Sequence, residues 1–409
     1  MIVGQNRGVD FLMTDDTTFY LDRQNISIKS QRNLRILELL RRHGSLSRTD
    51  ISKESGINPV TVSHYVDKLI SRKIVYEKEY DISSGGRRPL LLGLNPSSGY
   101  TIGISFNVLG VNAVVVDLDG NVKFRHSDRK RISSINDFID SLVNAADYIY
   151  ENTREIKDKI QGIGIGLGGI VDEENQVIRW PAESATGVTY SYVSMPVKNY
   201  FKERFNAPVF VGNDANLACF AEHWLCMGQD VRNVLYMYSG VSCGIMVNGE
   251  LYKGKQGCIG ELFINVPEDS STSYGDYSFF RQWQSDLGII DKVNSLILSQ
   301  KHEISRVTAL EEAFSLAIDG VQEILNDAAV NLGIKIALLV NVLNPDVVVI
   351  GGGMEKGGYT FIEKISESVK KHAFEEMVRN LKIIPSALGD EATALGAANM
   401  AVRNVFAAV

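Results

Sequence analysis

The spacing of apolar residues predicts two short helices near the start of the chain. Leucines recur at three-residue intervals from Leu34 to Leu40, which indicates one buried helix face, and Gly44 is a natural end for that helix. A second helix is expected to begin after Ser47, whose hydroxyl can accept hydrogen bonds from the free main-chain amides, and to end at Gly56.

A third helix is predicted to follow, with Asn58 as its N-cap and Pro59 in the first turn, where the missing N–H costs nothing. Its buried face would consist of Val62, Val66, Leu69 and Ile70, and its outer face of Val60, Thr61, Ser63, His64, Asp67 and Lys68. Two helices joined by a short turn, the second with small polar groups near its N-terminus, are typical of a helix-turn-helix that lays this second helix in the major groove. We therefore predict DNA contacts from Pro59, Thr61, Ser63, His64 and Lys68, with an idle surface histidine as the alternative interpretation of His64.

The next segment has the pattern of a wing. Apolar runs at Ile74–Tyr76 and Leu90–Leu92 predict two strands, and the Gly-rich stretch between them contains Arg87 and Arg88. Arginines at the tip of such a turn can enter a narrow, A·T-rich minor groove, where the potential is most negative. We predict that both arginines contact DNA. A three-helix packing module with a solvated hairpin is the alternative.

Charge is distributed unevenly along the chain. Residues 29–91 contain 13 Lys and Arg against 7 Asp and Glu, a net charge of +6. Because the whole chain carries −7, the remainder carries −13. A basic module joined to an acidic body is expected when one domain meets nucleic acid and the other has a different task.

The remainder of the chain has an α/β pattern with two related strand meanders. The first is expected at Tyr100–Ser105, Val111–Leu118 and Val122–Arg125, and the second at Val234–Tyr238, Gly244–Val247 and Glu250–Tyr252. Helices and further strands follow each meander. This repetition predicts a duplicated architecture of two lobes, and ligands bind preferentially in clefts between lobes.

Two glycine clusters resemble nucleotide-binding loops. Gly164–Gly169 formally satisfies G-x-G-x-x-G, but Ile170–Asp172 continues as strand, so no helix N-terminus is available to hold a pyrophosphate. Alternating glycines in a strand more often mark the close approach of another backbone or of a ligand. Gly351–Gly353 follows the buried strand Asp346–Ile350, and a nucleotide role and a purely conformational turn remain equally compatible with it.

Composition narrows the class of protein. The chain is 44% hydrophobic and 22% charged, which is typical of globular domains, and its longest apolar stretches are far short of the roughly 18 residues that would span a bilayer. The first residues lack the apolar core of a signal peptide. The four cysteines, Cys219, Cys226, Cys243 and Cys258, include no C-x-x-C pair, which favours free thiols in a reducing compartment. We expect a cytoplasmic protein without a membrane segment.

Several motifs, in one order, resemble the ROK family of repressors, open reading frames and sugar kinases. They are Val211–Asn216 followed by Ala221-Glu222, Gly257–Glu261, Asn344–Gly353 and Leu388–Ala398. The helix-turn-helix and its Gly-Arg-Arg-Pro wing are similar to the repressor branch of that family. The first 28 residues show no hydrophobic period and are expected to form a loosely ordered N-terminal arm, 1–28. With the resemblance, the rest divides into a winged helix-turn-helix domain at 29–95 and an α/β two-lobed, actin-like (ribonuclease-H-like) ROK domain at 96–409 with its cleft near 211–265.

The resemblance also makes the kinase chemistry checkable. The first phosphate loop of family kinases, Asp-Ile-Gly-Gly-Thr-Lys, corresponds here to Ser105–Gly110, without the carboxylate that would organise Mg²⁺. The second loop, Gly-Thr-Gly-Ile-Gly, corresponds to Gly240–Gly244 and has lost the threonine and the middle glycine. Without these two phosphate-binding loops, the protein could neither position the transferred phosphoryl group nor stabilise its charge. We expect no ATP or Mg²⁺ and no enzymatic activity.

The zinc site of the family is also predicted to be absent. Ile264 stands where the resemblance places the histidine ligand, and no cysteine follows Cys258 to supply the family's cysteine ligands. No metal and no cofactor are therefore expected.

The sugar-facing residues of the family are retained. By resemblance, Asn213, Asp214 and Glu261 would bind sugar hydroxyls, with Asp214 at the vestigial position of the catalytic base. Asn213-Asp214 also has the sequence of a helix cap for Ala215–Trp224, and both interpretations can hold together. Trp180 and Ser184–Thr186 are weaker candidates for the same pocket.

Three functions are compatible with this sequence. The first is a sugar-responsive transcriptional regulator, a repressor, that binds a palindromic DNA operator as a homodimer. The second is an ATP-dependent sugar kinase with an added DNA-binding domain. The third is a regulator controlled by a protein partner, without a sugar ligand.

Overall fold

The computed structural model describes residues 26–78, 90–107, 110–128, 135–168, 170–172, 177–182, 191–195, 199, 201, 205–228, 230–254, 259–262, 286–300 and 306–409. Almost all of the predicted N-terminal arm, 1–28, lies outside these residues. Contacts divide the chain into two units: unit 1 extends to Gly212 and includes Ala397–Val409, whereas unit 2 is Asn213–Gly396.

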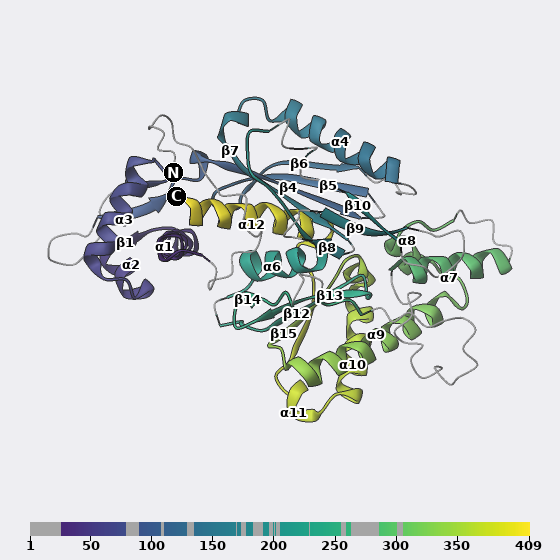
Figure 1. Ribbon diagram of the computed structural model, residues 1–409. Helices are drawn as coiled ribbons and strands as arrows, with labels where there is room; N and C mark the ends of the chain where they lie inside the picture. Colours follow the sequence, from purple (N-terminus) through teal and green to yellow (C-terminus); the bar gives the residue numbers. More distant parts are fainter. Residues whose placement is uncertain are drawn as a thin grey trace. The chain divides into compact units, whose positions relative to one another are not determined.

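Unit 1 begins with a module of three helices and a small antiparallel sheet (Figure 1). Its elements are α1 (Ile28–His43), β1 (Leu46–Ser47), α2 (Arg48–Ser55), α3 (Pro59–Ser71), β2 (Val75–Lys78) and β3 (Leu91–Leu94), with β3 between β1 and β2. Helices α1 and α2 end at Gly44 and Gly56, as predicted. Ser47 and Asp50 form a capping box at α2, and the Asn58 side chain accepts a hydrogen bond from the Thr61 amide at 2.8 Å.

The rest of unit 1 is a mixed sheet with the strand order β11-β7-β4-β5-β6. The strands are β4 (Tyr100–Asn107), β5 (Gly110–Asp117), β6 (Val122–Asp128), β7 (Ile160–Leu167) and β11 (Val209–Asn213). Helix α4 (Ile135–Asn152) packs on this sheet through β5 (Figure 1). Short helices η1 (Pro96–Ser98) and η2 (Lys157–Lys159) precede β4 and β7, and β8 (Ile170–Asp172), β9 (Val177–Ala182) and β10 (Ser191–Met195) form a separate antiparallel sheet.

Unit 2 has a second sheet with the order β14-β13-β12-β15-β16. Its strands are β12 (Val234–Tyr238), β13 (Ser242–Val247), β14 (Glu250–Leu251), β15 (Val347–Gly351) and β16 (Lys382–Pro385). Its helices are α6 (Asp214–Cys226), α7 (Asp286–Ser299), α8 (Leu310–Ser315), α9 (Val321–Leu343), α10 (Gly358–His372) and α11 (Glu375–Val378), with short helices η5 (Met354–Gly357) and η6 (Gly389–Glu391). The antiparallel meander β12-β13-β14 matches the repetition predicted from the sequence.

Helix α12 (Ala392–Ala408) belongs to both units, because the boundary falls between Gly396 and Ala397. In unit 2, a Cβ atom at Gly396 would lie 2.0 Å from the carbonyl oxygen of Leu217 in α6. In unit 1, a Cβ atom at Gly164 in β7 would lie 2.1 Å from the carbonyl oxygen of Ala397. Glycine is therefore required at both positions for α12 to pack this closely.

The contact of Gly164 also decides between the interpretations of the glycine cluster 164–169. Strand β7 extends through Leu167, β8 begins at Ile170, and no helix opens at these glycines. The cluster permits another backbone to approach, as we predicted, and offers no helix N-terminus to a dinucleotide.

Candidate DNA-reading surface and ligand site

The N-terminal half of α3 presents the side chains that we predicted for DNA. Pro59 and His64 are exposed, and Thr61, Ser63 and Lys68 are partly exposed. Behind them, the buried face of α3 consists of Val62, Val66 and Leu69. The helix therefore exposes a short polar stretch supported by an apolar core, which is what insertion into a groove requires.

Positive charge is concentrated beside this stretch. The pKa of Lys68 is lowered to about 8, first by burial and then by the neighbouring cations Lys29 and Arg72. Arg48 of α2 donates a hydrogen bond to the Ser63 carbonyl oxygen at 3.1 Å and pairs with Asp67 at 2.8 Å. Lys29 and Arg72 lie close enough to Lys68 to repel its charge, so a phosphate placed beside them would relieve that repulsion, whereas the charge of Arg48 is already balanced by its carboxylate partner.

The predicted wing is seen only at its base. Strands β2 and β3 pair antiparallel, from Val75 with Leu94 to Lys78 with Leu91. Arg87 and Arg88 lie outside the described residues, so their contact with DNA stays a prediction.

Asn213 and Asp214 stand where strand β11 passes into helix α6. Asn213 is the N-cap, and its side-chain oxygen accepts a hydrogen bond from the Asn216 amide at 3.1 Å. The Asp214 carboxylate accepts a hydrogen bond from the Ala215 amide at 2.8 Å. Burial raises the pKa of Asp214 to about 6. The capping role of Asn213 is therefore confirmed, whereas the ligand role of both residues is not decided by these contacts.

Glu261 lies within electrostatic reach of Asp214, on a segment with one strand-like pairing. It forms an isolated antiparallel bridge with Ser242 of β13, and a Cβ atom at Gly260 would lie 1.8 Å from the Cys243 carbonyl oxygen. The Glu261 side chain keeps contact with solvent. Burial of its carboxyl group, and then the charge of Asp214, raise its pKa to about 7. The charge of Asp214 disfavours the ionisation of Glu261, and carboxyl groups of this kind can exchange hydrogen bonds with hydroxyl groups.

Asn216 is a polar group that the sequence reasoning missed. Its side chain is 1% exposed, and neither Oδ1 nor Nδ2 has a hydrogen-bond partner in the described part of the chain. Buried amides are normally satisfied, so a water molecule or a polar ligand atom is expected beside it. In the sequence, the position of Asn216 two residues after Asp214 was the signal that could have marked it as a candidate site residue.

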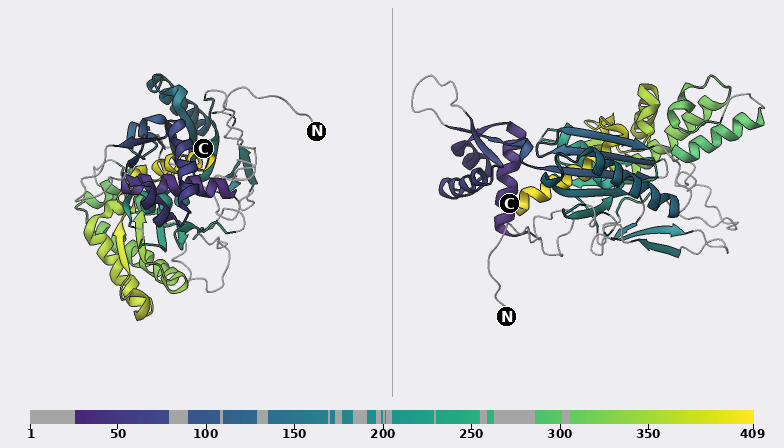
Figure 2. Two further views of the ribbon diagram at one scale, coloured as in Figure 1. Left: turned by 90° about the vertical axis from the view of Figure 1, so that its left-hand side faces the viewer. Right: turned by 90° about the horizontal axis from the view of Figure 1, so that it is seen from above.

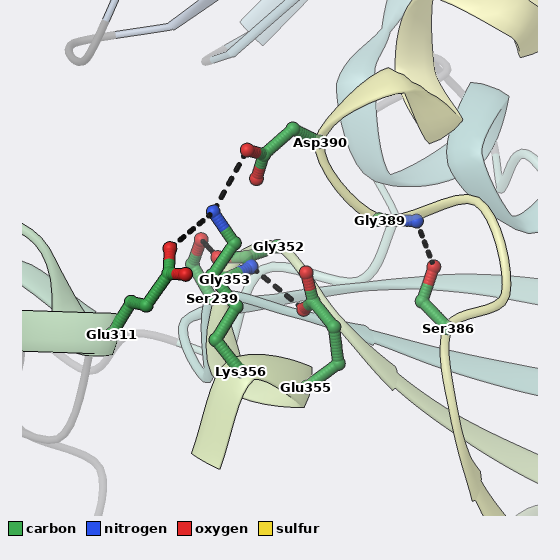
Figure 3. A network of polar contacts seen from close by, with 9 residues as sticks. All are labelled: Ser239, Glu311, Gly352, Gly353, Glu355, Lys356, Ser386, Gly389 and Asp390. Atoms are coloured by element: carbon green, nitrogen blue, oxygen red, sulfur yellow. Dashed lines mark hydrogen bonds and ion pairs between the residues drawn. The ribbon is translucent and has the colours of Figure 1, made fainter. Parts of the chain in front are cut away.

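The turn Gly351–Gly353 is surrounded by carboxylates (Figure 3). Gly352 and Gly353 have φ values of 65° and 97°, and the Gly352 carbonyl oxygen accepts a hydrogen bond from the Ser239 hydroxyl at 2.6 Å. Glu355 accepts a hydrogen bond from the Gly353 amide at 2.9 Å, and burial is the main cause that raises its pKa. The groups nearby are Glu311, Lys356 and Asp390, with Lys356 Nζ 2.8 Å from Asp390 and 3.8 Å from Glu311. These contacts show how the turn is held, with one ammonium group among the carboxylates, and the choice between a nucleotide role and a purely conformational turn stays open.

Lys335 occupies an unusual position beneath the segment that corresponds to the second phosphate loop. It is 1% exposed, and its Nζ donates a hydrogen bond to the Gly240 carbonyl oxygen at 3.0 Å. Burial lowers the pKa of Lys335 to about 8. A lysine within an apolar helix was the signal that the sequence reasoning did not use.

The described residues contain no group of three or more His, Cys, Asp or Glu side chains that could hold a metal ion. The free thiols of Cys219, Cys226 and Cys243 are described, whereas Cys258 and Ile264 lie outside these residues. On donor chemistry alone, an isoleucine cannot replace a histidine ligand, so the residues present do not fit the zinc site of the family. The absence of zinc stays a prediction.

Among the helices that the structure describes, none is long and apolar enough to cross a membrane. The side chain of Trp180 and residues 184–186, which we considered for the ligand pocket, are outside what the structure describes.

Comparison with known proteins identifies the family of this chain and the class of its N-terminal module. The profile of the ROK family matches residues 101–404, and a winged helix-turn-helix DNA-binding profile matches residues 29–76. The xylose repressor of Caldicellulosiruptor bescii is 28% identical over 93% of this chain and 97% of its own. The Escherichia coli K12 DNA-binding transcriptional dual regulator NagC is 25% identical over 90% and 92%. A solved ROK family transcriptional regulator, a homologue of the E. coli MLC protein, superimposes with a TM-score of 0.73 at 22% identity, covering 93% of this chain and 97% of its own.

Proposed function

Since this chain belongs to the ROK family and begins with a winged helix-turn-helix, we propose that it is a transcriptional repressor that binds operator DNA and responds to a sugar or sugar derivative. The observation that carries the proposal is the combination of the exposed polar stretch of α3 with the Asp214–Glu261 pair in one chain. In the proposed dimer, two copies of α3 would read the two halves of a palindromic operator.

On the DNA side, Thr61, Ser63 and His64 would contact base edges or phosphates, and Lys68 the phosphate backbone. Arg87 and Arg88 would reach the minor groove. Neutralised phosphates release counterions, so binding should weaken steeply as salt is raised.

On the ligand side, Asn213, Asp214 and Glu261 would accept and donate hydrogen bonds with sugar hydroxyls. Two of the relatives are named xylose repressor and N-acetylglucosamine repressor, which makes D-xylose and N-acetylglucosamine the first compounds to test. Asn216, whose two amide atoms have no hydrogen-bond partner among the residues that the structure describes, is a further candidate contact.

We further propose that the chain is not a kinase and holds neither ATP, Mg²⁺ nor zinc. Phe106, in the segment that corresponds to the first phosphate loop, is a 1% exposed residue of β4, and the serine before it stands where that loop has the aspartate that would organise Mg²⁺. Glu311 and Asp390 near the three-glycine turn already engage the ammonium group of Lys356, and the Glu355 carboxylate would repel a phosphate placed at the Gly353 amide.

The test begins with fragments selected by the full-length protein from its own genomic DNA. Fluorescence anisotropy then measures affinity for a selected fragment across salt concentrations, with and without D-xylose or N-acetylglucosamine. Arg87→Ala/Arg88→Ala should weaken binding and reduce the salt slope by about 2, since each phosphate contact contributes about one unit. Lys370→Ala/Lys371→Ala removes the same charge from the exposed end of α10 and serves as the control.

Three results would contradict the proposal. Failure to select any fragment at low salt removes the DNA-binding function. Rapid sugar-dependent consumption of ATP supports the kinase alternative. DNA binding without a response to millimolar sugars supports control by a protein partner.

A further inference from the structure

We infer that α12 is the link through which the candidate ligand site and the DNA-binding module influence each other, and that its joint to the module is a buried polar contact with α1. The inference rests on the proposed function and adds a route for regulation. The joint consists of Asn33, Glu38, Arg403 and Val409.

The joint is made by the last turns of α12. Arg403 Nε donates a hydrogen bond to Glu38 Oε1 at 3.2 Å, and each of these residues is 7% exposed. The Asn33 side-chain amide donates to the main-chain oxygen of Val409 at 2.6 Å, and Asn33 is 1% exposed. Figure 2 shows α1 beside this end of α12. The DNA-binding module is therefore held to the end of α12 by two specific buried hydrogen bonds.

The chemistry of this joint favours a positioning role. A buried ion pair gives little net stability compared with apolar side chains of similar size, because both ions must be desolvated. It does, however, fix one arrangement of two helices, since the partners must meet with hydrogen-bond geometry. Arg41 of α1 adds to the cluster: burial and the charge of Arg42 lower its pKa to about 10, while Asp119 and Glu38 act in the opposite direction.

The first turns of α12 are fastened to the candidate ligand site in unit 2. The Thr393 hydroxyl donates a hydrogen bond to the main-chain oxygen of Asp214 at 3.2 Å. Glu222 of α6 accepts hydrogen bonds from the Ser386 hydroxyl at 2.5 Å and the Leu388 amide at 3.1 Å, just before α12. Gly396 lets the two helix backbones touch. A displacement of Asp214 and α6 must therefore move the start of α12.

The 17 residues of α12 form one uninterrupted helix, about 25 Å long at 1.5 Å per residue. A continuous helix transmits an axial shift or a rotation better than a loop of the same length does. Coupling between two binding sites is reciprocal, so if α12 is the link, DNA bound to the module is expected to act on α6 through the same helix.

This reciprocity provides the experiment. Hydrogen–deuterium exchange of residues 213–226 is measured in the full-length protein with and without a selected genomic DNA fragment. We expect the DNA to change exchange in α6 at least threefold in the wild-type protein. Arg403→Ala leaves Glu38 buried without its partner and can unfold the module, so Glu38→Gln/Arg403→Met is the second variant, and Glu38→Arg/Arg403→Glu tests restoration of the pair.

In the double neutral variant, the protein should still bind the DNA fragment, but the effect of DNA on α6 should be lost, and the swapped pair should recover part of it. The exposed pair Arg306–Asp291 supplies the control variant Arg306→Met, which should leave the effect intact. An unchanged α6 in the DNA-bound wild-type protein, or an equal effect in the double neutral variant, would overturn the link. Absence of DNA binding by the wild-type protein would instead overturn the proposed function.

Discussion

The buried ammonium group of Lys335 in α9 donates a hydrogen bond to the carbonyl oxygen of Gly240, at the turn between β12 and β13. This contact places a cation directly against a segment that, in family kinases, corresponds to a phosphate loop. The cation is held by a main-chain oxygen, and burial lowers its pKa to about 8.

Lys335 should make stability depend on pH in alkaline solution. Between about pH 8 and the ordinary lysine value of about 10.5, the unfolded chain binds more protons than the folded protein, so the free energy of unfolding should rise with pH. Lys335→Met should lack this rise. Urea unfolding at pH 7 to 10 measures it, with the partly exposed Lys364→Met as control; parallel pH profiles for wild type and Lys335→Met would contradict the assignment.

Asp214→Asn should lower the pKa of Glu261, because the charge of Asp214 is one cause that raises it to about 7. Carbon-13 NMR of the glutamate carboxyl groups measures this titration directly, with Glu261→Gln used to assign the signal. The same substitution should weaken effector binding at least tenfold while leaving DNA affinity unchanged. A Glu261 titration that does not move would show that the two carboxyl groups do not interact.

DNA binding should weaken as pH rises through about 8, because Lys68 then loses its proton. Below that pH the ammonium group is charged and can neutralise a phosphate. Lys68→Arg should keep its charge and flatten the pH profile of the dissociation constant between pH 7 and 9. If the wild-type and Lys68→Arg profiles coincide, the phosphate contact of Lys68 is wrong.

Gly396→Ala should destabilise the protein by about 2 kcal/mol or more, since a methyl group would overlap the Leu217 carbonyl oxygen and neither backbone can withdraw easily. Gly164→Ala should have a similar cost. Gly162 is the graded control, because the nearest atoms to a Cβ there belong to side chains, first the Ala401 methyl group at 3.3 Å and then Phe210 and Thr101 at 3.8 Å. Equal melting temperatures for the three variants would show that α12 packs less tightly than described.

Helix ends and strand limits could be predicted from the sequence because they depend on residues that are close to them along the chain. Gly44, Ser47, Gly56 and Asn58 act on residues within one turn of themselves, and each stands at the helix end where it was expected. Strand limits were predicted to within a few residues for the same reason, since apolar runs and turn residues are adjacent in the sequence.

Contacts between residues that are far apart in the chain could not be predicted from the sequence. Glu38 and Arg403 are 365 residues apart, and each has the sequence context of an ordinary surface residue on an amphipathic helix. Glu222 and Ser386 are similarly remote, at a separation of 164 residues. The candidate ligand residues were predictable from motifs, but the unpartnered state of Asn216 and the enclosure of Lys335 follow only from how helices pack.

Residues Ile36 to Leu40 of α1 are buried without interruption, because the helix contacts its own module and the end of α12 at once. Because α1 contacts both the DNA-binding module and the end of α12, the module is matched to the ROK domain of its own chain. Exchanging recognition modules between relatives, to redirect a sensor to a new promoter, should therefore fail when the cut is made at the linker alone. A working chimera should need the closing turns of α12 transplanted together with α1.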